Sequence, residues 1–241
     1  MSRAVLITGA GARVGRYLAK GLAADGWAVA IHYNRSKAGA EDLAADISQQ
    51  GGTASIVQAN LFVPQDLETL IDRAAEAVGT PLTALINNAS TFDDDRAEDF
   101  SRASYDYHMD INLRAPLTLS QGFTRQLPKE KNGCIINMID QRVLKPDPTF
   151  FTYAMSKSAL HWATKTLAQS LAPNIRVNAV GPGPTLKNHS QTDEEFALEA
   201  ASTLLERGSP PETLLGAIRY LLGASSVTGQ MIAVDGGQHL S

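Results

Sequence analysis

Short apolar runs alternate along the chain with longer segments of helical pattern. Runs of this kind, bounded by turn residues, are typical of parallel strands buried on both faces. They cover residues 4–8, 28–31, 53–58, 82–86, 134–138, 176–180 and 231–234, and the helical patterns cover 16–24, 37–50, 64–78, 112–127, the segment after Tyr153 and 210–222. Because parallel strands are joined by helical crossovers, the alternation predicts an α/β fold: a doubly wound parallel sheet of about seven strands with helices on both faces.

A glycine-rich turn follows the first strand. Residues 9–15 read Gly-Ala-Gly-Ala-Arg-Val-Gly, and a helical pattern and a second buried run come next. Glycines let backbone N–H groups approach a pyrophosphate, and the N-terminus of the following helix stabilises its charge. This order predicts a dinucleotide-binding, Rossmann-type unit. The sequence contains no repeat, linker or low-complexity tract, so residues 1–241 are expected to form a single domain.

A second candidate motif lies in the later half of the chain. Tyr153 and Lys157 are four residues apart, so on a helix they share one face. A nearby positive charge favours the phenolate, and the pair therefore predicts a Tyr153 pKa lowered from its ordinary value of about 10. A Tyr and a Lys at this spacing are more often only packed against each other. The catalytic interpretation of Tyr153 and Lys157 therefore depends on the surrounding motifs.

Composition narrows the classes of function. The net charge is −4 and no basic cluster is present, which argues against nucleic acid as a partner. No apolar run approaches the roughly 20 residues of a membrane span. Strand-like sequence begins by Ala4, leaving no room for a signal peptide, and the single Cys134 reads as a core residue, so a cytoplasmic protein is expected. The five His show no metal-ligand spacing, and no metal is predicted.

The motifs together resemble the short-chain dehydrogenase/reductase family. The resemblance spans nearly the whole chain and rests on Thr8-Gly9 with Gly15, Asn87-Asn88-Ala89, Asn112, Tyr153 with Lys157, Gly181-Pro182-Gly183 and Val234-Asp235-Gly236-Gly237. It implies NAD(P) binding and hydride transfer, with Tyr153 as proton donor, Lys157 on the nicotinamide ribose and Asn112 positioning a relay water. The implied cofactor-binding residues are Gly9, Arg13, Val14, Gly15, Tyr33, Asn34, Arg35, Ser36, Asn60, Leu61, Asn88, Ala89, Ser90, Tyr153, Lys157, Pro182 and Gly183.

Departures from the common family pattern point to one branch. Arg13 stands where a glycine is usual, and Asp140 replaces the catalytic Ser thirteen positions before Tyr153. Both changes are similar to the pteridine reductase branch, which includes dihydromonapterin reductases, as are the run at residues 32–36 and Phe92. Asn60 replaces the usual Asp near the adenine, and only a modest effect is expected.

The end of the second strand favours NADP over NAD independently of the resemblance. An NAD site needs a carboxylate there to bind the ribose 2′-OH, and none lies between Ile31 and Lys37. Arg35, Ser36 and Lys37 stand there instead, near Arg13, and Arg forks suit a phosphate. NADPH is therefore the expected cofactor.

Asp140 carries the substrate prediction. An ionised Asp cannot donate a hydrogen bond to a carbonyl oxyanion, but it stabilises a protonated C=N group, and a raised pKa would let it donate a proton itself. A dihydropterin offers such a bond in a flat ring, on which Phe92 could stack. The alternatives are a helix cap for Asp140 and lid or core packing for Phe92. The expected substrate residues are Arg13, Ser90, Phe92, Asp140 and Tyr153.

The function expected is NADPH-dependent reduction of a dihydropterin to its tetrahydro form. A ketone or 3-oxoacyl thioester reductase of the same fold, or a catalytically silent NADPH-binding protein, are the alternatives. The resemblance also implies a substrate lid over residues 185–201 and a homotetramer, with Trp162 at an interface or in the core. The acidic stretch at residues 93–99 is interpreted as a solvated loop and helix start without chemistry.

Overall fold

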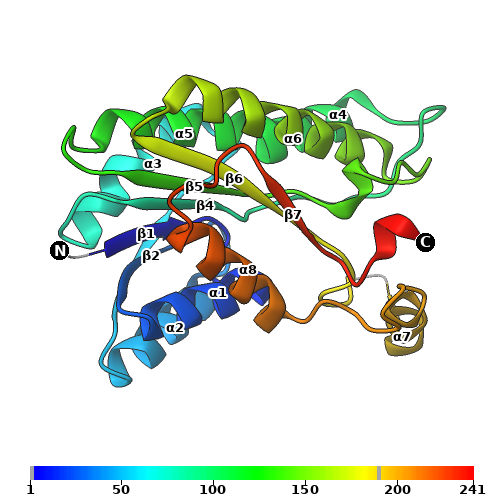
Figure 1. The fold of residues 1–241 in the computed structure, drawn as a ribbon, viewed down its shortest axis with the longest axis horizontal. Coiled ribbons are helices and arrows are strands. Elements are labelled where there is room, and N and C mark those ends of the chain that lie inside the picture. Colours follow the sequence, from blue (N-terminus) through cyan, green and yellow to red (C-terminus); the bar gives the residue numbers. More distant parts are fainter. Residues whose placement is uncertain (1–2, 189–190) are drawn as a thin grey trace.

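Seven parallel strands form one sheet in the computed structural model, which describes residues 3–188 and 191–241 (Figure 1). The strand order is β3-β2-β1-β4-β5-β6-β7. The strands are β1 (Arg3–Ile7), β2 (Trp27–Tyr33), β3 (Thr53–Gln58), β4 (Ala84–Asn87), β5 (Gly133–Met138), β6 (Ile175–Pro182) and β7 (Met231–Val234). The predicted doubly wound α/β fold is confirmed, because the chain runs outward from β1 to one edge and then returns to build the other half.

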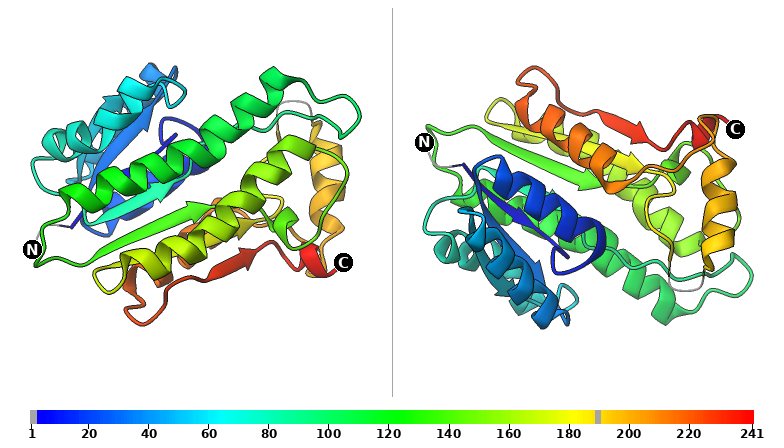
Figure 2. Two further views of the ribbon diagram at one scale, coloured as in Figure 1. Left: turned by 90° about the horizontal axis from the view of Figure 1, so that it is seen from above. Right: turned by 90° about the horizontal axis from the view of Figure 1, so that it is seen from below.

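Helices cover both faces of this sheet (Figures 1 and 2). One layer holds α1 (Arg13–Ala24), α2 (Lys37–Gln49) and α8 (Pro211–Gly223), and the opposite layer holds α3 (Pro64–Ala77), α5 (Ala115–Gln126) and α6 (Phe151–Leu171). Each layer has its own apolar core against the sheet: Leu18 and Leu215 belong to the first core, and Phe123 and Leu70 to the second. The inner strands, such as β1, β4 and β5, are buried on both faces, which is why they read as continuous apolar runs, whereas the edge strands β3 and β7 are only partly buried.

Two helices and one irregular turn were absent from the sequence prediction. Helix α4 (Arg102–Met109) and helix α7 (Asp193–Ala201) have weak apolar periodicity. Their N-cap residues are therefore the only sequence signal that indicates where they begin. Thr192 and Glu195 form a reciprocal capping box, a readable signal for α7. The helix predicted over 112–127 is divided: a π-helical turn covers Asp110–Arg114 before α5 begins.

The sheet topology gathers the candidate site at one edge. The order reverses between β1 and β4, and in open α/β sheets the crevice at the carboxyl ends beside such a switch point binds the ligand. The segments that leave β1, β4, β5 and β6 at this edge carry the glycine-rich turn, the Asn87–Ser90 segment, Asp140 and Pro182. The fold therefore brings together motifs that lie up to 170 residues apart.

No helix in residues 3–188 and 191–241 has the length and apolarity to cross a membrane. In the same part of the chain no cluster of three or more His, Cys, Asp or Glu side chains is arranged to hold a metal ion. Cys134 is buried with a free thiol, and burial raises its pKa to about 11, so the thiol stays protonated.

Candidate active site

The glycine-rich turn forms a narrow backbone cradle. Gly9 has a φ of +65°, and a Cβ at Gly15 would lie 2.4 Å from the Gly9 carbonyl oxygen, so neither position accepts a side chain without rearrangement. Arg13 also has a positive φ, +51°, a conformation that favours glycine and explains the family's usual residue there. The turn opens α1, so backbone N–H groups and the helix N-terminus face the same crevice. This donor set fits a pyrophosphate.

The His32 side chain, on β2, holds the glycine-rich turn in place by a hydrogen bond to Gly9. Its Nδ1 accepts the Gly9 N–H at 3.0 Å, so the proton of the neutral ring is on Nε2, which donates to the Ala59 carbonyl at 3.1 Å. Burial lowers the pKa of His32 from 6.5 to about 4, with a smaller opposing effect from Ala59. His32 was noted in the sequence only as part of a run, and no pattern there shows that its ring spans β1 and β3.

A loss of stability in mild acid is the expected consequence. Since the folded protein binds the His32 proton less readily than the unfolded chain, this contribution is complete above pH 6.5 and is lost as the pH falls toward 4. Between pH 7 and pH 5 the loss should be about 2 kcal/mol. His32→Gln, whose amide can accept and donate without titrating, is the control. Urea unfolding at both pH values checks the prediction, and equal losses in the two proteins would contradict it.

Asn88 holds the turn against β4. Its Nδ2 donates to the Thr8 carbonyl at 2.8 Å, while the Thr8 hydroxyl oxygen accepts the N–H groups of Asn88 and Ala89, both at 2.9 Å. A Cβ on Gly9 would lie 3.1 Å from the Ala89 Cα. The glycine-rich turn and the Asn87-Asn88-Ala89 motif, both predicted to bind the cofactor, therefore lie in direct contact.

The end of β2 supplies the residues expected at the adenosine ribose. Arg35, Ser36 and Lys37 are exposed, and Ser36 packs against the turn, since a Cβ on Gly11 would lie 2.6 Å from its Oγ. No carboxylate stands between Ile31 and Lys37. The strand end thus offers two cations and a hydroxyl, which suits a 2′-phosphate.

The residues expected near the adenine are less free than the sequence suggested. Tyr33 and Leu61 are buried, and Leu61 belongs to the core. The side-chain oxygen of Asn60, Oδ1, accepts the Phe62 N–H at 3.1 Å, which leaves the side-chain NH₂ group to face an adenine acceptor. The backbone N–H of Asn60 is taken by Asp66 at 2.8 Å.

Arg13 reaches across the crevice. Its guanidinium donates to the carbonyl oxygens of Leu186 and Lys187, at 3.2 and 2.9 Å, in the segment that follows β6. The Arg13 side chain therefore lies between the turn and the predicted lid, of which residues 189–190 are outside the described structure. Pro182 is the last residue of β6 and Gly183 follows it, and a Cβ on Gly183 would lie 2.7 Å from the Asp235 Cα.

Tyr153, Lys157 and Asp140 meet beside the end of β5. The Tyr153 hydroxyl donates to Asp140 Oδ2 at 2.8 Å, and Lys157 Nζ donates to the Met138 carbonyl at 2.9 Å. Lys157 Nζ lies 5.7 Å from the centre of the Tyr153 ring. Asp140 Oδ1 also accepts the Arg142 N–H at 2.8 Å, capping a short 3-10 helix, so the cap and the contact with Tyr153 coexist.

The pKa shifts keep the Tyr153 hydroxyl protonated and move Asp140 toward its protonated form. Burial, reinforced by the Asp140 carboxylate, raises the pKa of Tyr153 well above 10. Burial likewise raises the pKa of Asp140, and it lowers the pKa of Lys157 to about 8. The lowered Tyr153 pKa predicted from Lys157 is therefore wrong for this structure: desolvation and a neighbouring acid outweigh an ammonium that points to Met138.

Asn112 sits in the π-helical turn and is fully buried. Its Oδ1 accepts from Ser90 Oγ at 3.0 Å and the Thr91 N–H at 2.9 Å, and its Nδ2 donates to the Thr91 carbonyl and to Ser156 Oγ. The side chain thus ties the segment after β4 to helix α6. These bonds occupy both the oxygen and the nitrogen of the side-chain amide. A relay water would therefore be bound by groups other than this side chain.

Phe92 stands over Tyr153 in an aromatic group. Its ring stacks on Phe150 at 4.1 Å and meets Tyr153 edge-on at 4.7 Å, and the Arg142 guanidinium lies 5.1 Å from the Phe150 ring. Phe92 remains partly exposed. Phe150 and Arg142 were missed in the sequence because the loop that holds them has no periodicity.

The fold and this site define a dinucleotide-dependent oxidoreductase. The cradle, the switch point and the Tyr153–Lys157 pair lie along one crevice, and the residues at the β2 end suit a nucleotide phosphate. The sequence model of the short chain dehydrogenase family matches residues 3–197. The chain belongs to this family.

Relatives refine the assignment. A structure of FolM alternative dihydrofolate reductase 1 from Brucella canis, complexed with NADP, is 42% identical with a TM-score of 0.96, covering 99% of this chain and 94% of that one. A short chain dehydrogenase from Burkholderia cenocepacia with NADP is 31% identical, with a TM-score of 0.90 and coverage of 98% and 97%. A 3-oxoacyl-(acyl-carrier-protein) reductase from Synechocystis is 31% identical over 98% of this chain and 96% of its own. The predicted NADPH-dependent short-chain reductase is confirmed.

Proposed function

We propose that the chain is a cytoplasmic reductase that uses NADPH to reduce the C=N bond of a dihydropterin to the tetrahydro form. The contact between the Tyr153 hydroxyl and the Asp140 carboxyl carries this proposal. A ketone reductase needs a hydrogen-bond donor at position 140. A C=N substrate instead needs a proton on its nitrogen and a nearby carboxylate that stabilises the resulting cation. The FolM relative, an alternative dihydrofolate reductase, supports the same substrate class.

The side chains divide the work of protonation. NADPH, when bound, supplies a hydride to the ring carbon. Tyr153 and Asp140 hold a proton between them, since burial raises the pKa of both groups, and deliver it to the ring nitrogen. Lys157, with a pKa of about 8, remains mostly cationic at neutral pH and can bind the nicotinamide ribose. The reaction converts C=N to CH–NH with one hydride and one proton.

Substrate position follows from the aromatic group and the segment after β4. Phe92 presents a partly exposed ring next to Tyr153, and Ser90 is fixed by Asn112 on the same segment. A flat pterin ring against Phe92 would place its reducible bond near the Tyr153–Asp140 pair. Steady-state NADPH oxidation with dihydromonapterin, dihydrobiopterin and dihydrofolate against a ketone panel tests the proposal, and turnover confined to ketones would overturn it.

The cofactor preference gives a separate prediction. NADPH should bind at least about tenfold more tightly than NADH, because Arg35 and Ser36 can pair with the 2′-phosphate. Arg35→Asp should narrow this gap by weakening NADPH and sparing NADH. Arg102→Asp makes the same charge change on α4, on an exposed side chain paired with Asp106, and should leave the gap unchanged. Titration calorimetry measures both affinities, and equal wild-type values would contradict the prediction.

Reduction of a 3-oxoacyl thioester is the second candidate. The Synechocystis 3-oxoacyl-(acyl-carrier-protein) reductase aligns over nearly the whole chain, which favours it. Asp140 opposes it, because an ionised carboxylate would repel the oxyanion that develops from a ketone. Turnover of a 3-oxoacyl thioester at a rate above that of any dihydropterin would establish this candidate.

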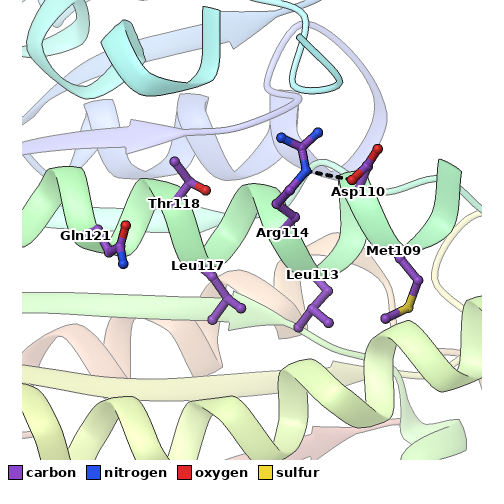
Figure 3. Close-up of a pocket in the computed structure, with 7 residues that line it drawn as sticks. All are labelled: Met109, Asp110, Leu113, Arg114, Leu117, Thr118 and Gln121. Carbon is purple, nitrogen blue, oxygen red and sulfur yellow. Dashed lines mark hydrogen bonds and ion pairs between the residues drawn. The ribbon is translucent and has the colours of Figure 1, made fainter. Parts of the chain in front are cut away.

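We also propose a homotetramer. A groove of about 280 Å³ runs along α4 and α5, with Met109, Leu113 and Leu117 on one side and the Asp110–Arg114 ion pair on the other (Figure 3). On α6, Trp162 is 68% exposed, which excludes the alternative of a core position within one chain. Family members commonly pack the helix that carries Lys157, here α6, and the preceding helix, here α5, across a dimer interface. The exposed Trp162 on α6 and the apolar groove along α5 support the same pairing here.

A further inference from the structure

A buried polar chain lies beside Tyr153, in residues that have no role in the proposed chemistry. It joins His108 at the end of α4, Thr152 at the start of α6 and Asp95 in the loop after β4. His108 and Thr152 are fully buried, and Asp95 is 8% exposed. Helices α4 and α6 lie side by side in the same layer (Figure 1). The expectation that the acidic stretch is a solvated loop is therefore wrong at Asp95, although its neighbours are exposed.

The partners of His108, Thr152 and Asp95 determine which atom donates in each of their hydrogen bonds. His108 Nε2 accepts the backbone N–H of Asp93 at 3.1 Å, and a backbone N–H can only donate. The ring proton is therefore on Nδ1, which donates to Thr152 Oγ1 at 2.7 Å. The Thr152 hydroxyl in turn donates to Asp95 Oδ2. Burial lowers the pKa of His108 against the opposing charge of Asp95, so the ring is neutral at pH 7.

Asp95 completes the N-terminus of α6. Its Oδ1 accepts the Thr152 N–H at 2.8 Å, its Oδ2 also accepts from Ser104 Oγ at 2.5 Å, and its carbonyl accepts the Phe151 N–H at 3.0 Å. Phe150, at the N-cap of α6, has no side-chain cap of its own. A carboxylate at this end of a helix satisfies free N–H groups and complements the helix dipole.

His108 thereby connects the chain next to Phe92 with the chain next to Tyr153. Asp93, which it holds on one side, directly follows Phe92, and Thr152, which it holds on the other, directly precedes Tyr153. The His108 ring lies 6.1 Å from the Tyr153 ring, and Phe92 lies 4.7 Å from Tyr153. One imidazole therefore sets the spacing between the aromatic that would stack on the substrate and the phenol that would protonate it.

We propose that His108 is a positioning residue that fixes Phe92 relative to Tyr153 and so sets the aromatic surface against which a flat ring would lie beside the Tyr153 hydroxyl. The inference rests on the proposed function for its substrate, and on the Asp93–His108–Thr152 bonds for its geometry. Small displacements of positioning groups have large effects on turnover, since a shift of about 1 Å can cost about a hundredfold. His108 does not contact the reacting atoms, so its effect should appear in substrate KM before cofactor affinity.

Two variants of His108 separate its hydrogen bonds from its volume. His108→Leu fills a similar volume with an apolar side chain. The Asp93 N–H and the Thr152 hydroxyl oxygen then lose their hydrogen bonds to the imidazole. His108→Gln carries an amide that can accept from Asp93 and donate to Thr152. We expect His108→Leu to raise the dihydropterin KM about tenfold and the NADPH Kd by less than about twofold, and His108→Gln to restore KM to within about threefold of wild type.

Thr164→Val controls for general destabilisation. Thr164 is buried on the same helix, about three turns beyond Thr152, and accepts a hydrogen bond from Asn137 Nδ2 at 3.0 Å. This variant also loses buried hydrogen bonds, since the Thr164 hydroxyl accepts from Asn137 and donates to the Leu160 carbonyl, but they lie far from Phe92, and its KM should match the wild type. An unchanged KM in His108→Leu, an equal rise in Thr164→Val, or no recovery in His108→Gln would overturn the proposal.

Amide hydrogen exchange tests the positioning without any turnover. In His108→Leu, exchange at Asp93 and Thr152 should accelerate at least about tenfold relative to Thr164→Val, because both segments lose their shared anchor. If the wild type reduces no dihydropterin, the proposed function fails, and exchange alone decides this inference. Equal exchange at Asp93 in the two variants would then overturn it.

Discussion

Replacing Asp140 with serine should lower kcat/KM for a dihydropterin by about a hundredfold to a thousandfold while changing the NADPH Kd by less than about twofold. The Asp140 carboxyl accepts the Tyr153 hydroxyl at 2.8 Å, and burial raises its pKa, so it can share or hold the proton that the ring nitrogen needs. A serine hydroxyl can donate to an oxyanion but cannot stabilise a protonated nitrogen. The same variant should gain activity toward ketones.

Asp147→Ser is the matched control for this variant. Asp147 lies in the same loop and pairs with Arg142 at 3.3 Å, but it makes no contact with Tyr153 among the interactions of the described residues. Its kcat/KM should stay close to that of the wild type. Stopped-flow measurement of NADPH oxidation compares the three proteins. A dihydropterin rate that is unchanged in Asp140→Ser would remove Asp140 from the mechanism.

Replacing Tyr153 with phenylalanine should lower kcat by about a thousandfold. The phenyl ring keeps the packing against Phe92 and His108, but the hydroxyl that delivers the proton is lost, and Asp140 Oδ2 loses its donor. NADPH should still bind, with a Kd within about threefold of wild type, since the cradle around Gly9 is untouched. Single-turnover kinetics at saturating NADPH measures the chemical step directly.

Tyr107→Phe is the control for Tyr153→Phe, because Tyr107 is an exposed tyrosine on α4 that faces Phe62. Combining Tyr153→Phe with Asp140→Ser should cost little more than Tyr153→Phe alone. Groups that act on one proton as a unit show such non-additive losses. Fully additive losses would mean that the two residues serve separate steps.

Sequence patterns predicted those parts of the fold that depend on local and periodic signals. The seven predicted runs became the seven strands, with boundaries that differ by no more than two residues, because strands buried on both faces must be continuously apolar. The glycine-rich turn was readable because Gly9 and Gly15 have no room for a side chain. The missing carboxylate after Ile31 likewise indicated the NADP preference without a structure.

Features that depend on contacts across the fold were not readable. The raised pKa of Tyr153 comes from burial and from Asp140, thirteen residues away, and spacing to Lys157 alone gave the opposite sign. Asp95 belongs to a stretch of acidic residues that looks solvated, and only the tertiary fold shows that it caps α6 and meets Thr152. Such long-range polar contacts have no period in the sequence.

Transfer of deuterium from C4-deuterated NADPH to a dihydropterin tests the central claim most directly. The purified protein, mixed with this cofactor and dihydromonapterin, should yield a tetrahydropterin that carries one deuterium on the ring carbon, detected by mass spectrometry. Tyr153→Phe should yield almost none in the same time. Loss of NADPH with no deuterium in the pterin, or labelling only of a ketone from the comparison panel, would contradict a C=N reductase acting through Tyr153 and Asp140.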